Sequence, residues 1–293
     1  WANVLGVRDG VRTMGVFTVL KITPLIIMVL LGFQHVTGCT LIPGAPFIVD
    51  DLGGTTLLLI YAYIGFETIA VTAGETSQPR STLPKALVGT VVITGLLYFV
   101  IVLVFVSIVP ASDYATATLV DVGRALAGPA GAIAITLAAI FSIGGNLSGS
   151  ILAAPRLVFS LAENRLLPQW FGHVHAKYAT PDRCIIIMGA LALVLALTGS
   201  FVQLAVASSV ARLLAYILCI ASLPVIRRNA DEETRSKAYR LPGGYTIPGI
   251  GLIICLWLLT HSKAESWVAV SVLVAIGLVL YAIEKGAWLR SGE

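Results

Sequence analysis

The feature that most constrains this chain is a series of eight apolar runs, most of them close to the length that crosses a lipid bilayer. A helix needs about 20 apolar residues to span a hydrocarbon core of roughly 30 Å. The runs cover residues 13–33, 55–73, 87–109, 130–161, 184–198, 202–226, 247–260 and 267–283. They are continuous rather than alternating, which excludes a transmembrane β-barrel. We therefore predict an all-α polytopic membrane protein with about eight transmembrane helices.

The composition supports lipid rather than water as the surrounding solvent. Of the 293 residues, 57% are apolar and only 12% are charged, whereas a soluble domain carries about 25% charged residues. The loops are too short to form separate domains, so we expect one transmembrane domain over residues 1–293, with the bilayer as its partner. There is no long basic run with interleaved aromatic residues, so we expect no nucleic-acid partner.

The distribution of Lys and Arg predicts the orientation. If all eight runs span, one side of the membrane holds fifteen of these residues and the other side only Arg124 and Lys263. Cytoplasmic loops carry the excess of Lys and Arg, which predicts a plasma-membrane (inner-membrane) protein with both chain ends in the cytoplasm. The runs 184–198 and 247–260 are short, but removing either one would destroy this asymmetry, so both are kept.

Lys21 and Glu67 lie deep inside the predicted spans, where a buried charge is expensive and is a functional candidate by default. Lys21 lies eight residues past Thr13, so it either snorkels to the interface or acts as a fixed cation or proton-exchanging amine in a cavity. Glu67 follows Gly65 near the middle of its run. Either the helix breaks there around a solute cavity, as in transporters, or it stays intact and buries a protonated carboxyl.

Two further features lie within the apolar runs. The stretch 142–150 (SIGGNLSGS) contains small residues that suit close helix packing, while Ser142 and Asn146 are candidates to line a solute path. Arg212 lies nearer the outer end of its run, which favours outward snorkelling.

No catalytic or cofactor motif is present. The four cysteines form no CxxC pair, and His173 and His175, two residues apart, do not share a helix face. We therefore expect no metal and no cofactor. A membrane enzyme acting on lipid would need clustered His, Asp or Glu at a membrane face, and a channel would repeat polar residues along one helix face. A membrane-embedded enzyme and a channel are therefore the less favoured alternatives to a transporter, and we predict that the protein is not an enzyme.

A family resemblance becomes specific at residues 61–67 (YAYIGFE), followed by residues 74–86 (GETSQPRSTLPKA). This sequence resembles the amino acid–polyamine–organocation permeases, whose sixth helix breaks at an aromatic-small-aromatic-x-Gly-Phe-Glu motif. Further similarity lies in residues 3–21, in residues 155–168 (PRLVFSLAENRLLP), in residues 177–183 (KYATPDR) and in the pair Arg227-Arg228. The resemblance covers essentially the whole chain.

The resemblance implies a leucine-transporter-like fold of twelve helices with inverted repeats. The eight runs would be helices five to twelve, and helices one to four, with their half of the solute site, would be absent from this sequence. Ile64, Gly65 and Phe66 match the unwound segment that meets the solute, and Tyr61 matches the aromatic that closes over it. Glu67 matches the buried acid after the break. Lys21 matches a lysine whose amine replaces a sodium ion.

These observations lead to one principal function and its alternatives. We predict a secondary active transporter of amino acids that is proton-coupled or an exchanger, with Lys21 or Glu67 as the proton-exchanging group. The alternative solutes are polyamines or other organic amines. The lack of an obvious extra acid favours neutral over cationic amino acids.

The first prediction concerns Lys21. A fixed ammonium supplies the charge that otherwise arrives with a sodium ion, and it donates up to three hydrogen bonds. Lys21→Met should therefore abolish or strongly reduce net amino acid uptake by the complete protein in liposomes without unfolding it. Uptake should follow an imposed pH gradient. Normal transport by the variant, or uptake that follows a sodium gradient instead, would contradict this role.

Overall fold

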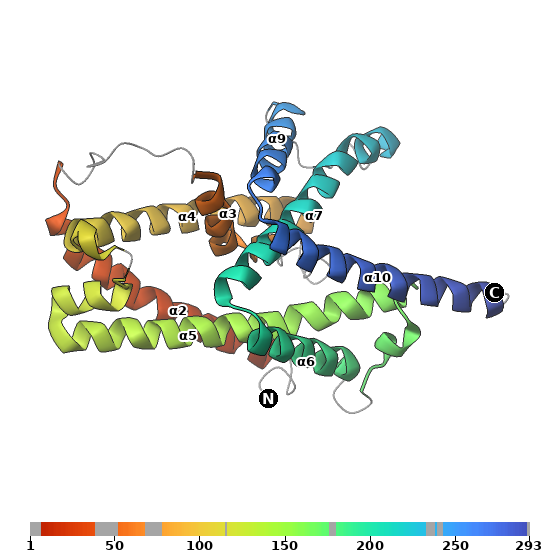
Figure 1. Cartoon of the computed structure of the whole chain (residues 1–293), viewed down its shortest axis with the longest axis horizontal. Coiled ribbons are helices and arrows are strands. Elements are labelled where there is room, and N and C mark those ends of the chain that lie inside the picture. Colours follow the sequence, from red (N-terminus) through yellow and green to blue (C-terminus); the bar gives the residue numbers. More distant parts are fainter. Residues whose placement is uncertain are drawn as a thin grey trace. The chain divides into compact units, whose positions relative to one another are not determined.

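The computed structural model describes residues 7–38, 52–67, 78–114, 116–175, 180–232, 238 and 243–291. Within these ranges the secondary structure consists of eight α-helices and three short 3₁₀ turns, with no strand. The α-helices are α2 (Val7–Gly32), α3 (Leu52–Tyr63), α4 (Pro79–Ile108), α5 (Leu119–Glu163), α6 (Asp182–Thr198), α7 (Phe201–Asn229), α9 (Thr246–Thr260) and α10 (Ala264–Ser291) (Figure 1). The turns are η1 (Phe33–His35), η5 (Ala111–Asp113) and η6 (Gln169–Gly172). Each predicted apolar run overlaps one of the α-helices, so the all-α prediction is confirmed.

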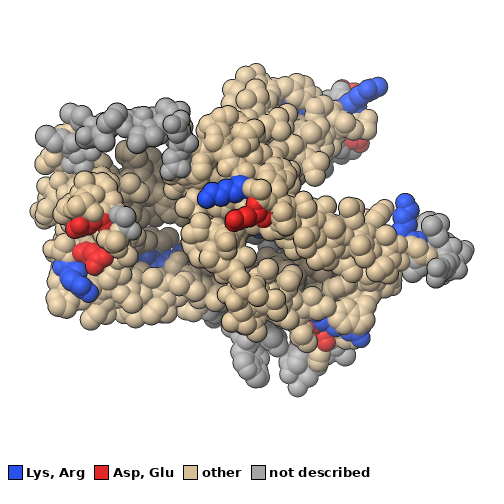
Figure 2. Space-filling model, in the orientation of Figure 1, with Lys and Arg blue, Asp and Glu red and all other residues tan. Residues whose placement is uncertain are grey.

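Helix length and surface chemistry fit a membrane protein. Five segments are long and apolar enough to cross a bilayer, namely Gly15–His35, Ser81–Ile108, Leu119–Glu163, Phe201–Asn229 and Ala264–Gly286, while α3 and α9 are shorter apolar helices. Large apolar side chains such as Leu30, Ile93 and Leu218 are about 70% exposed. Charged side chains occupy only a few spots on the face drawn in Figure 2. Lipid tails, unlike water, can cover such a surface without cost.

The chain divides into two compact units, each described here by itself. Unit 1 comprises Trp1–Phe47, Val92–Ser160 and Trp170–Met188; unit 2 comprises Ile48–Val91, Leu161–Gln169 and Gly189–Glu293.

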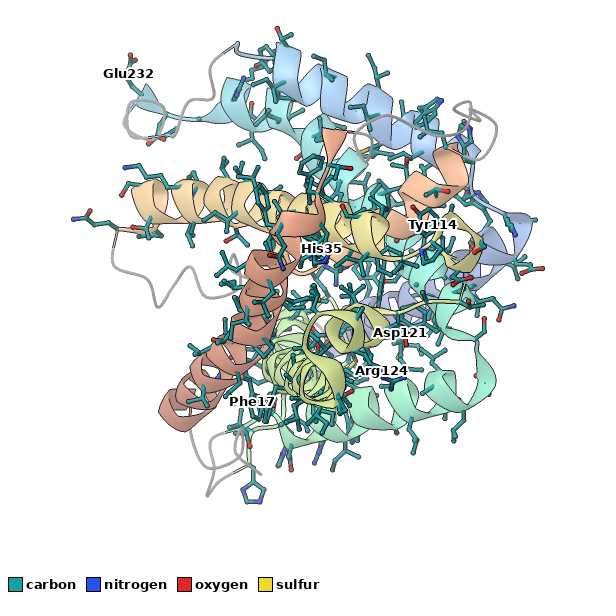
Figure 3. All side chains as sticks on the ribbon, turned by 90° about the vertical axis from the view of Figure 1, so that its left-hand side faces the viewer. Phe17, His35, Tyr114, Asp121, Arg124 and Glu232 are labelled. Atoms are coloured by element: carbon teal, nitrogen blue, oxygen red, sulfur yellow. The ribbon has the colours of Figure 1, made fainter. Side chains whose placement is uncertain are left out.

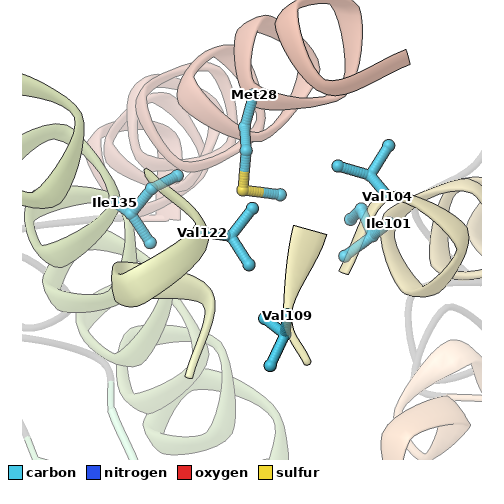
Figure 4. Packing of buried hydrophobic residues seen from close by; sticks show 6 residues of the cluster. All are labelled: Met28, Ile101, Val104, Val109, Val122 and Ile135. Carbon is cyan, nitrogen blue, oxygen red and sulfur yellow. The ribbon is translucent and has the colours of Figure 1, made fainter. Parts of the chain in front are cut away.

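The core of unit 1 brings together α2, the second half of α4, and α5 (Figure 4). Its buried members are Met28, Ile101, Val104, Val109, Val122 and Ile135. Helix α2 approaches α4 closely at Gly32, where an added Cβ would lie 2.3 Å from Cγ1 of the fully buried Val104. A small residue at this point therefore sets the separation of the two helices, as is common in membranes.

Helix α5 consists of two parts with a turn between them. Ala127 (φ −137°) and Gly128 (φ +61°) leave helical geometry, and Pro129 follows them. Only glycine adopts such a positive φ without strain. The predicted run of residues 130–161 corresponds to the longer second part, which continues to Glu163.

In unit 2 the buried apolar residues converge on α7. They are Leu57 of α3, Val210 and Leu213 of α7, Cys255 and Leu258 of α9, and Val270 of α10. Helix α7 begins with a capping box, in which the Ser200 side chain accepts from the Gln203 amide and the Gln203 side chain accepts from the Ser200 amide. This cap satisfies two backbone donors at the helix start. Helix α7 is therefore the element against which α3, α9 and α10 are placed.

The close approach at Gly32 gives a second prediction. Gly32→Ala should lower the thermal stability of the purified complete protein, because forcing a methyl group onto buried Val104 costs about 1–3 kcal/mol. The control is Gly15→Ala on the same helix, where nothing lies within 4 Å of the added Cβ. That variant should be neutral or gain up to about 1 kcal/mol of helix propensity. Equal melting temperatures for the two variants would disprove the close contact.

Candidate functional site

The helix that carries the aromatic-Gly-Phe-Glu motif ends inside the motif. Helix α3 stops at Tyr63, residues 64 and 65 form a turn, and Phe66 and Glu67 continue in a 3₁₀ turn. Gly65 has φ +119°, a conformation that other residues rarely adopt. This confirms the expected break and excludes an intact helix through Glu67. Residues 68–77, which include Gly74 and Glu75 of the family motif, lie outside the described residues.

The Glu67 carboxylate is engaged at both oxygens. Its Oε1 forms an ion pair with Nη1 of Arg212 on α7. Its Oε2 accepts a hydrogen bond from the Gly65 backbone amide at 3.0 Å and another from the Tyr216 hydroxyl at 3.3 Å. The Glu67 carboxylate thus serves as hydrogen-bond acceptor for a backbone amide at the break. Arg212 balances its charge in a setting where an isolated carboxylate is costly.

The ion pair corrects the interpretation of Arg212. Outward snorkelling was favoured from its position near the outer end of its run, but its guanidinium contacts Glu67, and the two side chains are 39% and 24% exposed. The sequence does contain a signal for this ion pair. An acid and a base that both lie at membrane depth tend to pair with each other, although they are 145 residues apart in sequence.

Aromatic rings lie on both sides of the break. The ring of Tyr61, one turn before it, meets Phe201 of α7 edge to face at 5.6 Å between centroids. The ring of Phe66, next to Glu67, lies 6.1 Å from that of Tyr216. Tyr61 is 36% exposed. These contacts come from the start and the middle of α7, so the same helix supports the segment before and after the break.

In unit 1, the small residues of the 142–150 stretch serve helix packing. The Phe17 side chain of α2 would touch a Cβ added at Gly145 at 3.3 Å, and its ring stacks on Phe141 with centroids 5.9 Å apart. Figure 3 shows Phe17 on α2 beside α5. The packing interpretation therefore holds for Gly145. Ser142 is half-buried and Asn146 is exposed; their part in a solute path stays a prediction.

Lys21 lies one turn beyond Phe17 on α2 and is half-buried. Further along α2, Pro24 and Ile27 line an apolar crevice together with Ala134 of α5. Residues later in α2 thus meet residues earlier in α5, so the two helices run antiparallel. Lys21 falls at a level of α5 between Ala134 and Phe141, where Phe17 stacks.

The loop histidines take part in a polar contact of their own. His173 Nδ1 lies 2.8 Å from Oδ1 of Asp182 at the start of α6. This hydrogen bond holds the pKa of the exposed Asp182 carboxyl below its usual value. No group of three or more His, Cys, Asp or Glu that could hold a metal ion occurs in the described ranges.

Comparison with known proteins places these features in a family. The family model described as amino acid permease matches residues 1–284. The chain is 25% identical over 282 residues to the methylthioribose transporter of Bacillus subtilis, and the match covers 94% of this chain and 60% of that protein. It is 24% identical over 297 residues to the branched-chain amino acid permease BcaP of the same organism, with the same coverage of 94% and 60%.

A third relative is named for a different activity. The chain is 26% identical over 298 residues to the serine/threonine exchanger SteT of Bacillus subtilis, covering 97% of this chain and 66% of that protein. The first relatives thus show that the chain spans about 60% of the length of the proteins it matches. The family and these relatives bear the names of transporters rather than enzymes. Together with the apolar helices, they identify an integral membrane protein.

The geometry of Gly65 gives a third prediction. Gly65→Ala should destabilise the complete protein by about 1–3 kcal/mol, because its positive φ strains any residue with a Cβ. Crowding is not the cause, since nothing lies within 4 Å of the added atom. Thermal melting in detergent measures the effect, with Gly89→Ala inside α4 as the control, since its added Cβ also meets nothing. If Gly65→Ala melts no lower than that control, Gly65 does not have the positive φ.

Proposed function

Because the chain belongs to the amino acid permease family, we propose that it moves amino acids across a membrane as part of a secondary active transporter. The activity of the whole protein is a proposal, since the chain spans about 60% of its first relatives. We propose that the protein lies in the plasma membrane with both ends of this chain in the cytoplasm. The excess of Lys and Arg on one side supports this orientation.

One observation carries the proposal, namely the break at Gly65 directly after the apolar helix α3. Broken helices at membrane depth are tolerated only where the freed backbone is buried in protein or lines a cavity. In transporters such breaks bind solutes near the midplane. We assign Ile64, Gly65 and Phe66 to contact the amino and carboxylate groups of the solute. Tyr61 closes over the solute as an aromatic lid.

We propose that transport is coupled to protons, or is an exchange, and that Lys21 is the coupling group. Glu67 was the other candidate, but both of its oxygens are already held by Arg212, Tyr216 and the Gly65 amide. Among the described residues no acceptor engages the Lys21 ammonium. In the same unit, we assign Ser142 and Asn146 as polar side chains that line the solute path.

Uptake by the complete protein in liposomes tests the proposal. Radiolabelled amino acids, a polyamine and methylthioribose would be compared, the last because one relative bears that name. We expect saturable uptake or exchange of at least one amino acid, faster with an inward proton gradient or with an amino acid inside the vesicle. If only the polyamine or only methylthioribose were transported, that compound would replace amino acids as the proposed substrate. No movement of any solute would contradict the function.

The fourth prediction separates the ring of Tyr61 from its hydroxyl. Tyr61→Ala should raise the KM for the transported amino acid or lower the turnover rate, because the lid over the solute is lost. Tyr61→Phe keeps the ring and its edge contact with Phe201, so it should behave much like the natural protein. Unchanged transport kinetics in Tyr61→Ala would remove Tyr61 from the solute site.

A further inference from the structure

We infer that Arg212 is a positioning residue for solute binding, which acts by holding Glu67 and, through it, the broken segment of residues 64–67. This inference rests on the proposed function but concerns a contact that the motif itself does not contain. It follows from four features of unit 2.

The first feature is that Glu67 closes the break from within. Its side chain accepts the amide of Gly65, two residues earlier, at 3.0 Å. In an apolar helix end this hydrogen bond replaces a backbone acceptor that the break removes. The shape of the unwound segment therefore depends on where the Glu67 carboxylate is held.

The second feature is the arrangement on α7. Arg212 and Tyr216 are four residues apart, so they project from the same face of the helix. Arg212 takes one carboxylate oxygen and Tyr216 donates to the other. Two anchors on one rigid helix fix both the position and the rotation of the carboxylate, which a single contact would not do.

The third feature is the packing beside these polar contacts. Val210 and Leu213 of α7 are almost completely buried in the same cluster as Leu57 of α3. Helix α3 is thus fixed on α7 before the break, and the ion pair fixes the segment after it. The turn at residues 64 and 65 is held at both ends by one helix.

The fourth feature is charge balance. A carboxylate with 24% exposure next to apolar rings needs a positive partner to remain in place. Without Arg212, Glu67 would be drawn toward solvent and the Gly65 amide would lose its acceptor. Arg212 therefore acts on the solute site through Glu67, not by touching the solute.

The test is a double-variant cycle in the complete protein, reconstituted in liposomes. Arg212→Gln and Glu67→Gln should each raise the KM by about tenfold or more, because each leaves one partly buried charge without its partner. The double variant Arg212→Gln/Glu67→Gln should recover most of the loss, since two neutral amides leave no unpaired charge. Arg124→Gln, which removes an exposed arginine of α5, is the matched control and should not change the KM.

Hydrogen–deuterium exchange supplies a readout that needs no transport. In lipid nanodiscs, the amides of residues 64–67 should exchange faster in Arg212→Gln than in the natural protein, and the double variant should restore protection. If the natural protein moves no solute, the proposed function fails, and this measurement still decides whether Arg212 holds the break.

Three results would overturn the inference. An unchanged KM in Arg212→Gln would mean that the ion pair does not position the solute site. A double variant as impaired as Arg212→Gln alone would mean that Arg212 acts directly on the solute. Unchanged exchange at residues 64–67 would mean that the break keeps its shape without the ion pair.

Discussion

The structure depends on the rule that backbone polar groups at membrane depth must find partners within the protein. Continuous helices meet the rule by themselves, which is why the described chain is almost entirely helical. The segment after Tyr63 departs from continuous helix, and side chains provide the missing hydrogen-bond partners. Glu67 accepts from the Gly65 amide and is in turn held by Arg212 and Tyr216. A break that would be unstable in lipid becomes a fixed element of the fold.

In unit 1, small residues allow the helices to pack closely. Lipid tails are as apolar as the helices, so close packing rather than the hydrophobic effect holds the helices together. Gly32 lets α2 approach Val104 of α4, and Gly145 receives Phe17 of α2. The close approach of α2 and α5 places Lys21 at a defined level within the unit. The position of the proposed coupling amine is thus a consequence of glycine packing.

Hydropathy predicted six of the eight α-helices by length and apolarity. The asymmetry of Lys and Arg was needed to retain the two short runs that correspond to α6 and α9. Hydropathy was less informative at helix ends. Helix α4 begins at Pro79, eight residues before the apolar run, since its first two turns are polar and carry no hydropathy signal. The break at Gly65 was predictable from the local motif. The pairing of Glu67 with Arg212 was not assigned, because it joins residues 145 apart and depends on how α3 packs against α7.

The central claim is that the solute binds at the broken segment, and cysteine protection measures this most directly. Ile64→Cys would be placed in the complete protein after replacement of its native cysteines, and Ser112→Cys, exposed in η5, would serve as the control. We predict that a transported amino acid slows alkylation of Ile64→Cys in proportion to its occupancy and leaves Ser112→Cys unaffected. Equal alkylation rates at Ile64→Cys with and without a transported, saturating amino acid would contradict it.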